Sequence, residues 1–142
     1  MYEREGMQSQ ANRDVRPGAL LGVAIALLKR PDKWAPGRLA ETAQGTQVDP
    51  TDPGAVRWSC MGVVMRACSL RNVSQDGPAF RAAIMCLREA AGLRRSGRSL
   101  LDWEKDPGRS HEEVLRALRE AVTLAHLREQ TGTASQEPAL RR

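Results

Sequence analysis

Ten consecutive apolar residues at positions 19–28 are the feature that most constrains how this chain can fold. Pro17, just before them, has a backbone angle suited to the first turn of a helix, and Pro31, just after them, cannot continue one. We therefore predict a helix from about Gly18 to Arg30. Because its apolar side chains point in nearly every direction, this helix should lie at the centre of a domain.

The same ten residues do not predict a membrane segment or a secretory signal. A run of this length crosses only about half of a bilayer. It ends in Lys29-Arg30-Pro31, where a secretory signal needs small neutral residues before its cleavage site. We therefore expect no membrane partner.

The composition favours a single helical domain. A chain of 142 residues suits one domain and is too short for two independent cores beside flexible ends. Only 4% of the residues are aromatic, so the core must come mainly from Leu, Ala, Val, Ile and Met. That mixture favours helices over a β-sandwich.

The segment between Pro31 and Pro53 is too rich in proline and glycine to hold a long helix. Within it, residues 38–42 and 46–48 flank a three-residue linker that ends in Gly45. This pattern predicts a short two-stranded hairpin between the first two helices.

Two further helices are predicted from their start signals. Asp52-Pro53 combines a capping residue with a proline suited to the first helical turn, which predicts a helix over about 53–69. Gly77-Pro78 opens the next helix, over about 78–91, and Gly92 ends it.

The capping box Ser110-His111-Glu112-Glu113 is the clearest local signal in the chain. Its serine and its second glutamate each satisfy a backbone amide of the first turn, and a helix over about 111–128 should follow. We expect residues 92–109, which precede it, to form an irregular connector with a basic half and an acidic half.

Together these elements predict a mainly α fold, a compact bundle of about four helices with a short β-hairpin between helices 1 and 2. The single helical domain covers residues 17–128. Polar residues on either side of it predict a flexible arm at 1–16 and a flexible tail at 129–142.

The three cysteines, Cys60, Cys68 and Cys86, are an odd number and form no C-x-x-C pair. They therefore argue against a disulfide framework and against a zinc ribbon. A reducing cytoplasm is the simplest setting for them, and we expect ordinary buried thiols without a bound metal.

No set of residues predicts catalysis or a cofactor. The two histidines, His111 and His126, lie about four turns apart on one predicted helix, so one small ligand could not contact both. The chain has no phosphate-binding glycine loop. Asp102, Glu104 and Asp106 alternate along a loop, a pattern typical of solvated charge. An enzyme would instead require an enclosed polar pocket with a perturbed His, Cys or carboxylate.

Arginine supplies most of the positive charge. The net charge is +5, and nineteen of the twenty-two cationic residues are arginine. Guanidinium groups bind phosphates and carboxylates, but a GC-rich genome produces the same excess, and these arginines are scattered. Only the cluster Arg94, Arg95 and Arg98 fits a nucleic-acid backbone, and acidic residues follow it directly.

Trp34 and Trp103 lie in turn-rich segments, and two roles fit them. They could plug the ends of a small helical core, with the indole N–H donating to a loop carbonyl. They could instead be exposed anchors in a partner interface, where tryptophan and arginine are over-represented. Trp58, beside the buried face of its helix, is expected to be structural.

Three segments carry a resemblance to a known family. They are Trp34-x-x-Gly37-x-x-Ala40 with Gly45 and Val48-Asp49, Ala55-Val56-Arg57-Trp58 with Gly62, and Trp103 followed by Pro107-Gly108-Arg109-Ser110. Over about residues 18–127 the chain resembles an uncharacterised family of small proteins from actinobacteria, other high-GC bacteria and their phages. The last segment is similar to that family's tryptophan, Asn-Asp, Pro-Gly-Arg-Thr signature before the final helix.

The chain departs from that family mainly at polar positions. Glu104 and Lys105 stand where the family has Asn and Asp, Cys60 sits one residue later than the usual cysteine, and Val63-Val64 replaces Ala-Leu. These changes weaken the case for a shared polar site. The resemblance implies a fold and a mobile-element setting, but no reaction.

From these observations we expect binding rather than catalysis. The hypothesis is a non-enzymatic interaction protein of a phage or other mobile element that binds and modulates a host defence or regulatory protein. The alternative is a nucleic-acid-associated accessory protein that uses its basic surface. A protein partner is expected, a homo-oligomer stays open, and no cofactor is predicted. The predicted partner-binding residues are Trp34, Arg94, Arg95, Arg98, Trp103, Asp106 and Arg109.

Overall fold

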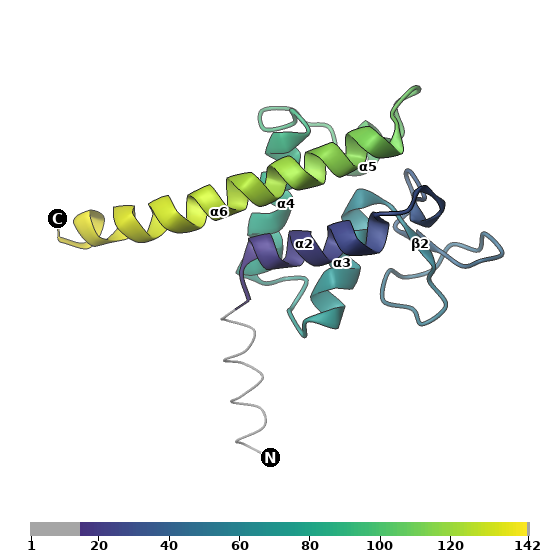
Figure 1. Cartoon of the computed structure of the whole chain (residues 1–142), viewed down its shortest axis with the longest axis horizontal. Coiled ribbons are helices and arrows are strands. Elements are labelled where there is room, and N and C mark those ends of the chain that lie inside the picture. The colour runs from purple at the N-terminus through teal and green to yellow at the C-terminus, as the bar shows by residue number, and fades with distance from the viewer. Residues whose placement is uncertain (1–14, 142) are drawn as a thin grey trace, which may run out of the picture.

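The computed structural model describes the backbone of residues 15–141 and the side chains of residues 15–131. This part of the chain contains five α-helices, one 3-10 turn and one two-stranded antiparallel sheet (Figure 1). The predicted mainly α fold is confirmed. The elements are α2 (Pro17–Leu28), η1 (Pro31–Lys33), β1 (Ala40–Glu41), β2 (Arg57–Trp58), α3 (Cys60–Leu70), α4 (Pro78–Ala90), α5 (Leu100–Glu104) and α6 (His111–Arg141).

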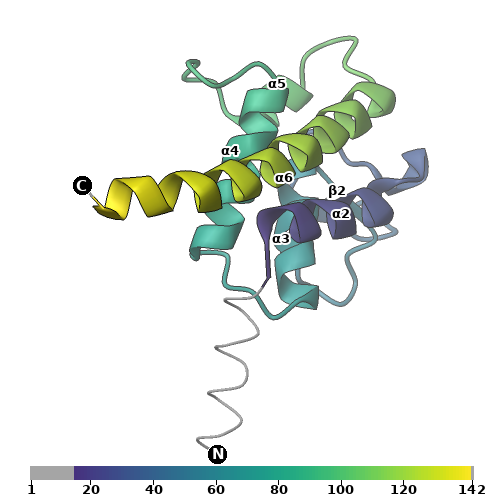
Figure 2. The ribbon, with the colours of Figure 1, turned by 60° about the vertical axis from the view of Figure 1, so that its left-hand side comes forward.

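The helix α2 lies at the centre of the domain, as its sequence predicts. It packs against α3, α4 and α6 (Figure 2). Leu20, Leu21 and Leu28 are fully buried. Its burial is not complete on every side, since Gly22 and Ala26 are exposed. These two residues carry little apolar surface, so their exposure costs little. In the described part of the chain, no helix is both long and apolar enough to cross a membrane.

The helix α6 closes the core. It runs beside α2 and crosses α4 (Figure 1). Its buried face contributes Val114, Leu118 and Ala121 to the main apolar cluster. The helix begins at His111 as predicted and continues to Arg141, beyond the residue near 128 at which its apolar pattern ends. The flexible tail at 129–142 stays a prediction. The predicted arm at 1–16 lies outside the described residues, apart from its last two.

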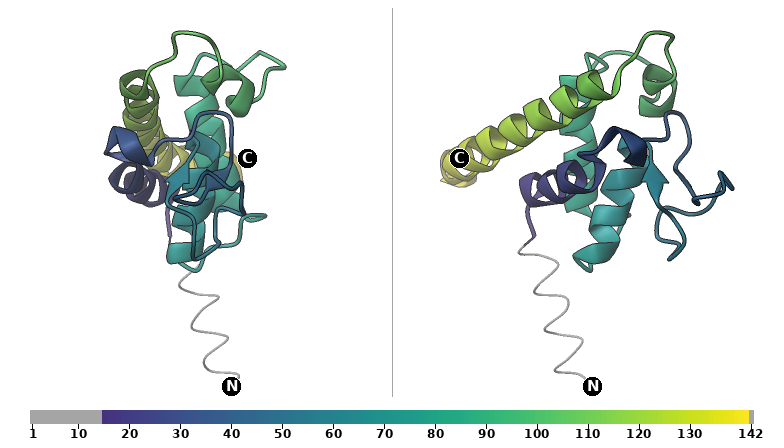
Figure 3. Two further views of the ribbon diagram at one scale, coloured as in Figure 1. Left: turned by 90° about the vertical axis from the view of Figure 1, so that its right-hand side faces the viewer. Right: turned by 45° about the vertical axis from the view of Figure 1, so that its right-hand side comes forward.

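The predicted hairpin forms only as a tight turn, and the two strands of the sheet pair differently. β1 pairs with β2, so that Ala40 faces Trp58, whereas the turn closes through a single bridge between Glu41 and Gln47. Gly45 has a φ of +85°, which a glycine adopts without strain. The turn-rich segment between η1 and β2 lies at the opposite end of the molecule from the end of α6 (Figure 3).

The second predicted helix starts later than expected. Asp52 does not cap a helix, because its side chain accepts a hydrogen bond from Gly54 N (2.7 Å) within a local turn. Ser59 is the actual cap, with its Oγ accepting from Gly62 N at 3.0 Å. Residues before Ser59 cannot be helical because they form β2, whose pairing with β1 takes precedence over the local start signal.

The capping box at the start of α6 is confirmed, and it supports a testable prediction. Ser110 Oγ accepts from Glu113 N (3.1 Å), and Glu113 Oε1 accepts from Ser110 N (3.2 Å). Ser110→Ala should lower the free energy of unfolding by about 1 kcal/mol, because the amide loses its acceptor. Urea unfolding followed by circular dichroism measures this. Ser69→Ala, an exposed serine in the last turn of α3, is the control and should change stability by less than about 0.5 kcal/mol. Equal losses in the two variants would contradict the capping role.

Candidate functional site

The short helix α5 organises the candidate site. It interrupts residues 92–109, which we expected to be irregular throughout, and Ser99 caps it by accepting from Asp102 N at 3.1 Å. The signal for this helix is the pattern Ser99-x-x-Asp102, the same kind of start signal as the one before α6. Because α5 is helical, its neighbouring residues Trp103 and Glu104 point to different sides, one toward a surface groove and one into the interior.

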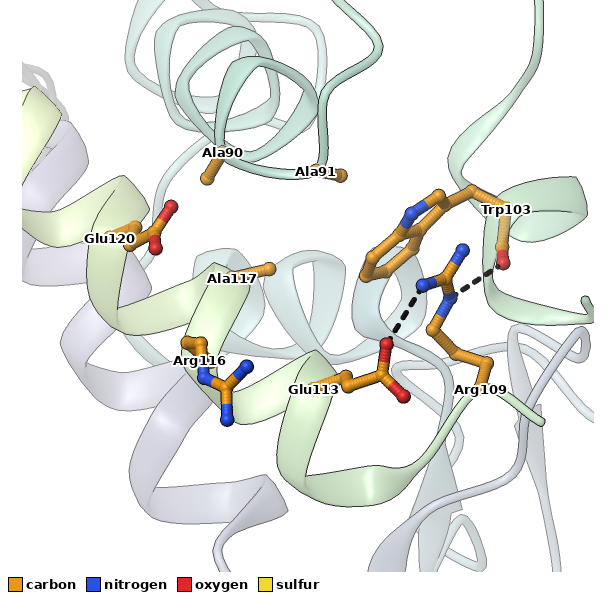
Figure 4. Close-up of a pocket in the computed structure, with 8 residues that line it drawn as sticks. All are labelled: Ala90, Ala91, Trp103, Arg109, Glu113, Arg116, Ala117 and Glu120. Carbon is orange, nitrogen blue, oxygen red and sulfur yellow. Dashed lines mark hydrogen bonds and ion pairs between the residues drawn. The ribbon is translucent and has the colours of Figure 1, made fainter.

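Trp103 is a core residue that also reaches a groove. Its side chain is 7% exposed and belongs to the main apolar cluster. The guanidinium of Arg109 lies over the indole ring, 4.2 Å from its centroid, and Arg109 Nε donates to Trp103 O at 3.1 Å (Figure 4). The structure thus combines burial of the tryptophan with an arginine stacked on its outer face.

An ion-pair network continues from Arg109 along the surface. Arg109 pairs with Asp106 (3.2 Å) and with Glu113 (3.0 Å), and Asp106 also pairs with Arg98 at 2.6 Å. The hydrogen bond that Arg98 donates to Asp106 is the main reason that the pKa of Asp106 is lowered, and the same bond raises the pKa of Arg98. The geometry therefore brings together four of the predicted partner-binding residues, which are Arg98, Trp103, Asp106 and Arg109.

The other three predicted residues lie apart from this network. Arg94 pairs with Glu89 of α4 at 3.6 Å, and Arg95 is exposed without an ion-pair partner in the described part of the chain. Trp34 is half-buried on the interior side of α5. The basic cluster of the sequence is therefore split, and two of its three cations face carboxylates.

A groove runs between α4 and α6 beside Trp103. Its first pocket has a volume of about 200 Å³, with Ala90 and Ala91 on one wall and Ala117 on the other (Figure 4). Arg109, Glu113, Arg116 and Glu120 complete the lining. An adjoining pocket of about 380 Å³ shares Ala90 and Glu120 with the first. We call these two pockets together the α4–α6 groove.

Glu104 points the other way and is buried. It is 1% exposed, whereas the alternation of acids in the sequence predicted solvated charge, so that prediction is wrong for this residue. Its Oε2 accepts from Trp34 Nε1 (2.6 Å) and from Cys60 N (2.9 Å), and its Oε1 accepts from Gly37 N at 3.5 Å. The indole N–H of Trp34 thus bonds to a carboxylate rather than to a loop carbonyl.

Burial raises the pKa values of two neighbouring groups, the carboxyl group of Glu104 and the thiol of Cys60. Desolvation raises the pKa of Glu104 to about 7, and its hydrogen bonds from Trp34, Cys60 and Gly37 oppose this rise only in part. Burial, followed by the negative charge of Glu104, raises the pKa of the Cys60 thiol well above its usual range. Cys60, Cys68 and Cys86 are all buried free thiols, as predicted. A raised thiol pKa disfavours the reactive thiolate.

The two histidines contact opposite ends of α2. His111 Nε2 lies 2.7 Å from Leu28 O at the end of the helix, and the ring of His126 packs against Gly18 at its start. They share no ligand position, as the sequence predicted. Within residues 15–131, no group of three His, Cys, Asp or Glu side chains is placed to hold a metal ion.

The fold and the site define a small helical domain built on one central helix, with a tryptophan-walled groove on its surface. The chain belongs to a family of unknown function, DUF6197, whose family model matches residues 12–124. Membership in an uncharacterised family, which the sequence segments predicted, is thereby confirmed. No curated protein and no solved structure matches the chain.

Proposed function

We propose that this protein is a non-enzymatic interaction protein that binds a protein partner through the α4–α6 groove. The observation that carries the proposal is the stack of Arg109 on Trp103 at the edge of an alanine-lined pocket. Tryptophan and arginine are the residue types most enriched among the side chains that dominate binding energy in protein interfaces. The ion pairs from Arg109 to Asp106 and Glu113 fix the orientation of the guanidinium before a partner binds.

The open shape of the groove also favours a protein partner over a small molecule. Its pockets of about 200 and 380 Å³ both open widely to the surface, whereas a small-ligand site buries most of its ligand. The second pocket continues the groove along α4 and α6. A short groove with alanine walls and a charged rim suits a few side chains of a partner.

The buried Glu104 does not support an enzymatic function. Its carboxylate is the kind of perturbed group that an enzyme would use, but neither pocket of the groove is lined by Glu104 or Cys60. A catalytic acid must lie within reach of its substrate. Glu104 instead accepts hydrogen bonds in the interior from Trp34, Cys60 and Gly37.

The setting of the interaction is part of the proposal. The resemblance to proteins of high-GC bacteria and their phages supports a mobile-element protein in the cytoplasm that modulates a host defence or regulatory protein. Nucleic-acid binding has less support, because Arg94 and Arg98 face Glu89 and Asp106. Compensated cations release fewer counterions from a phosphate backbone.

Filling the groove should weaken partner binding strongly. Ala90 lines both pockets and ends α4, where a positive side chain is favourable, so Ala90→Arg should fold normally while blocking the groove. Affinity capture from host lysate, followed by binding measurements on the captured protein, should show a loss of at least about tenfold.

The matched control is Ala26→Arg, which adds the same side chain at an exposed position of α2. It should bind like the unmodified protein. Equal binding by all three proteins would exclude the groove. Capture that disappears after nuclease treatment would instead favour the nucleic-acid alternative.

A further inference from the structure

Glu104 joins three segments that are distant in the sequence. Trp34 and Gly37 lie between η1 and β1, and Cys60 is the first residue of α3. All three donate to the one carboxyl group, at 2.6, 3.5 and 2.9 Å respectively. Together with Leu100 and Trp103, which pack in the main apolar cluster, this group holds α5 to the domain.

The carboxyl group has no compensating cation. Among the described residues no arginine, lysine or histidine forms an ion pair with Glu104. Lys105 is exposed, and its side chain passes over Gly37. From α6, His111 faces the ring of Trp34 and bonds to Leu28 O. From α3, the only titratable group facing Glu104 is the neutral thiol of Cys60. An ionised Glu104 thus has N–H dipoles around it, but no positive side chain.

The hydrogen bonds alone favour an ionised carboxyl group, but a neutral group can keep them. Both short bonds end on Oε2, which can accept them as the carbonyl oxygen of a protonated acid. Oε1 accepts the long bond from Gly37 N, at 3.5 Å, and is the oxygen on which a proton disturbs the bonds least, while the Cys60 thiol also bonds to the group. Burial outweighs these bonds, because ionisation places a charge on a group that is 1% exposed.

We propose that Glu104 is a pH-responsive latch, which holds α5 against Trp34 and the start of α3 when protonated and loosens α5 when it ionises. The raised pKa of Glu104, about 7 in the closed form, supports this direction. In an opened α5 the carboxyl group meets water and returns toward its ordinary pKa of 4.5. Because the closed form binds the proton more tightly, the contribution of this group is complete below pH 4.5. It is lost as the pH rises to 7.

Hydrogen exchange of the full chain, measured by NMR and corrected for intrinsic exchange rates, tests the latch. The informative amides are those of Cys60, Trp103 and Lys105, which bond across or within α5. Between pH 5 and pH 8 their opening constant should rise on the order of 100-fold, as expected from the two pKa values. The buried amides of α6 should change much less.

Two variants separate the latch from other effects. Glu104→Gln keeps an acceptor oxygen but cannot ionise, so its α5 amides should show no such rise. Glu112→Gln, at an exposed position of α6, should behave like the unmodified protein. Both histidines are present in all three proteins, so any effect of their charge appears in each.

Three results would overturn the proposal. They are an unchanged opening constant in the unmodified protein, the same rise in Glu104→Gln, and an equal rise at the α6 amides, which would indicate loosening of the whole domain. If Glu104→Gln fails to fold, the carboxyl carbon of Glu104 is titrated in the unmodified protein. A midpoint near 7 supports the latch, and a midpoint near 4.5 excludes it. Because Trp103 immediately precedes Glu104, loosening of α5 would also alter the groove. That consequence depends on the proposed function, whereas the latch itself does not.

Discussion

Gly62→Ala is expected to lower the free energy of unfolding by more than about 4 kcal/mol, a large part of the total stability of a domain of this size. Gly62 lies in the first turn of α3, where a Cβ would overlap the backbone carbonyl oxygen of Leu39 and lie 2.7 Å from its carbonyl carbon. Leu39 cannot retreat, because Arg38 O accepts from Ser59 N (3.0 Å) and Ala40 pairs with Trp58. The clash therefore forces α3 away from the sheet.

Gly22→Ala is the matched control for this variant. Gly22 lies inside α2, is exposed, and has open space where a Cβ would be. Alanine there should raise the free energy of unfolding by about 0.5–1 kcal/mol, because it restricts the unfolded chain and favours the helix. Thermal and urea unfolding followed by circular dichroism measure both variants. A loss below about 1 kcal/mol in Gly62→Ala would show that the two backbones do not approach as described.

Trp103→Ala should cost about 3–5 kcal/mol, the range for removing a large aromatic side chain from a core. The ring is 7% exposed, packs in the main cluster and supports the guanidinium of Arg109. Its loss leaves a cavity between α5, α4 and α6 and frees Arg109 from the groove edge. Urea unfolding followed by circular dichroism is the suitable measurement, because it does not depend on tryptophan fluorescence.

Trp103→Phe tests whether another aromatic ring can fill the space that the indole occupies. No protein group in the described part of the chain bonds the indole N–H of Trp103, so phenylalanine loses only contact area and should cost less than about 2 kcal/mol. It also retains a surface on which Arg109 can stack. Equal losses for alanine and phenylalanine would contradict the cavity argument and point to a specific role of the indole.

Local signals in the sequence predict most of the helices, and pairing between distant segments explains where they fail. Pro17 and Pro78 open α2 and α4 as predicted, because each needs only its own neighbours. The start of α3 is different, since Asp52 and Ser59 are both suitable caps. The choice of Ser59 depends on the pairing of β2 with β1, a contact that no local pattern contains.

The same reasoning applies to the site. The alternation of Asp102, Glu104 and Asp106 predicts solvated charge only if the segment is extended, and α5 replaces that period of two with a helical one. Asp102 is exposed as expected, while Glu104 turns into the interior. The acceptor role of Glu104 could not be predicted, because its donors lie as far as 70 positions away, at Trp34.

The contact between α2 and α6 has a consequence for how the chain acquires its structure during translation. His111 closes on Leu28 across 83 positions, and α6 covers much of the apolar surface of α2. At ribosomal speeds of about 5–20 residues per second, α2 would wait roughly 4–17 s before its covering helix emerges. The most hydrophobic helix of this protein is therefore made early and is covered by α6 only late in translation. During those seconds its apolar surface is available for binding by a chaperone.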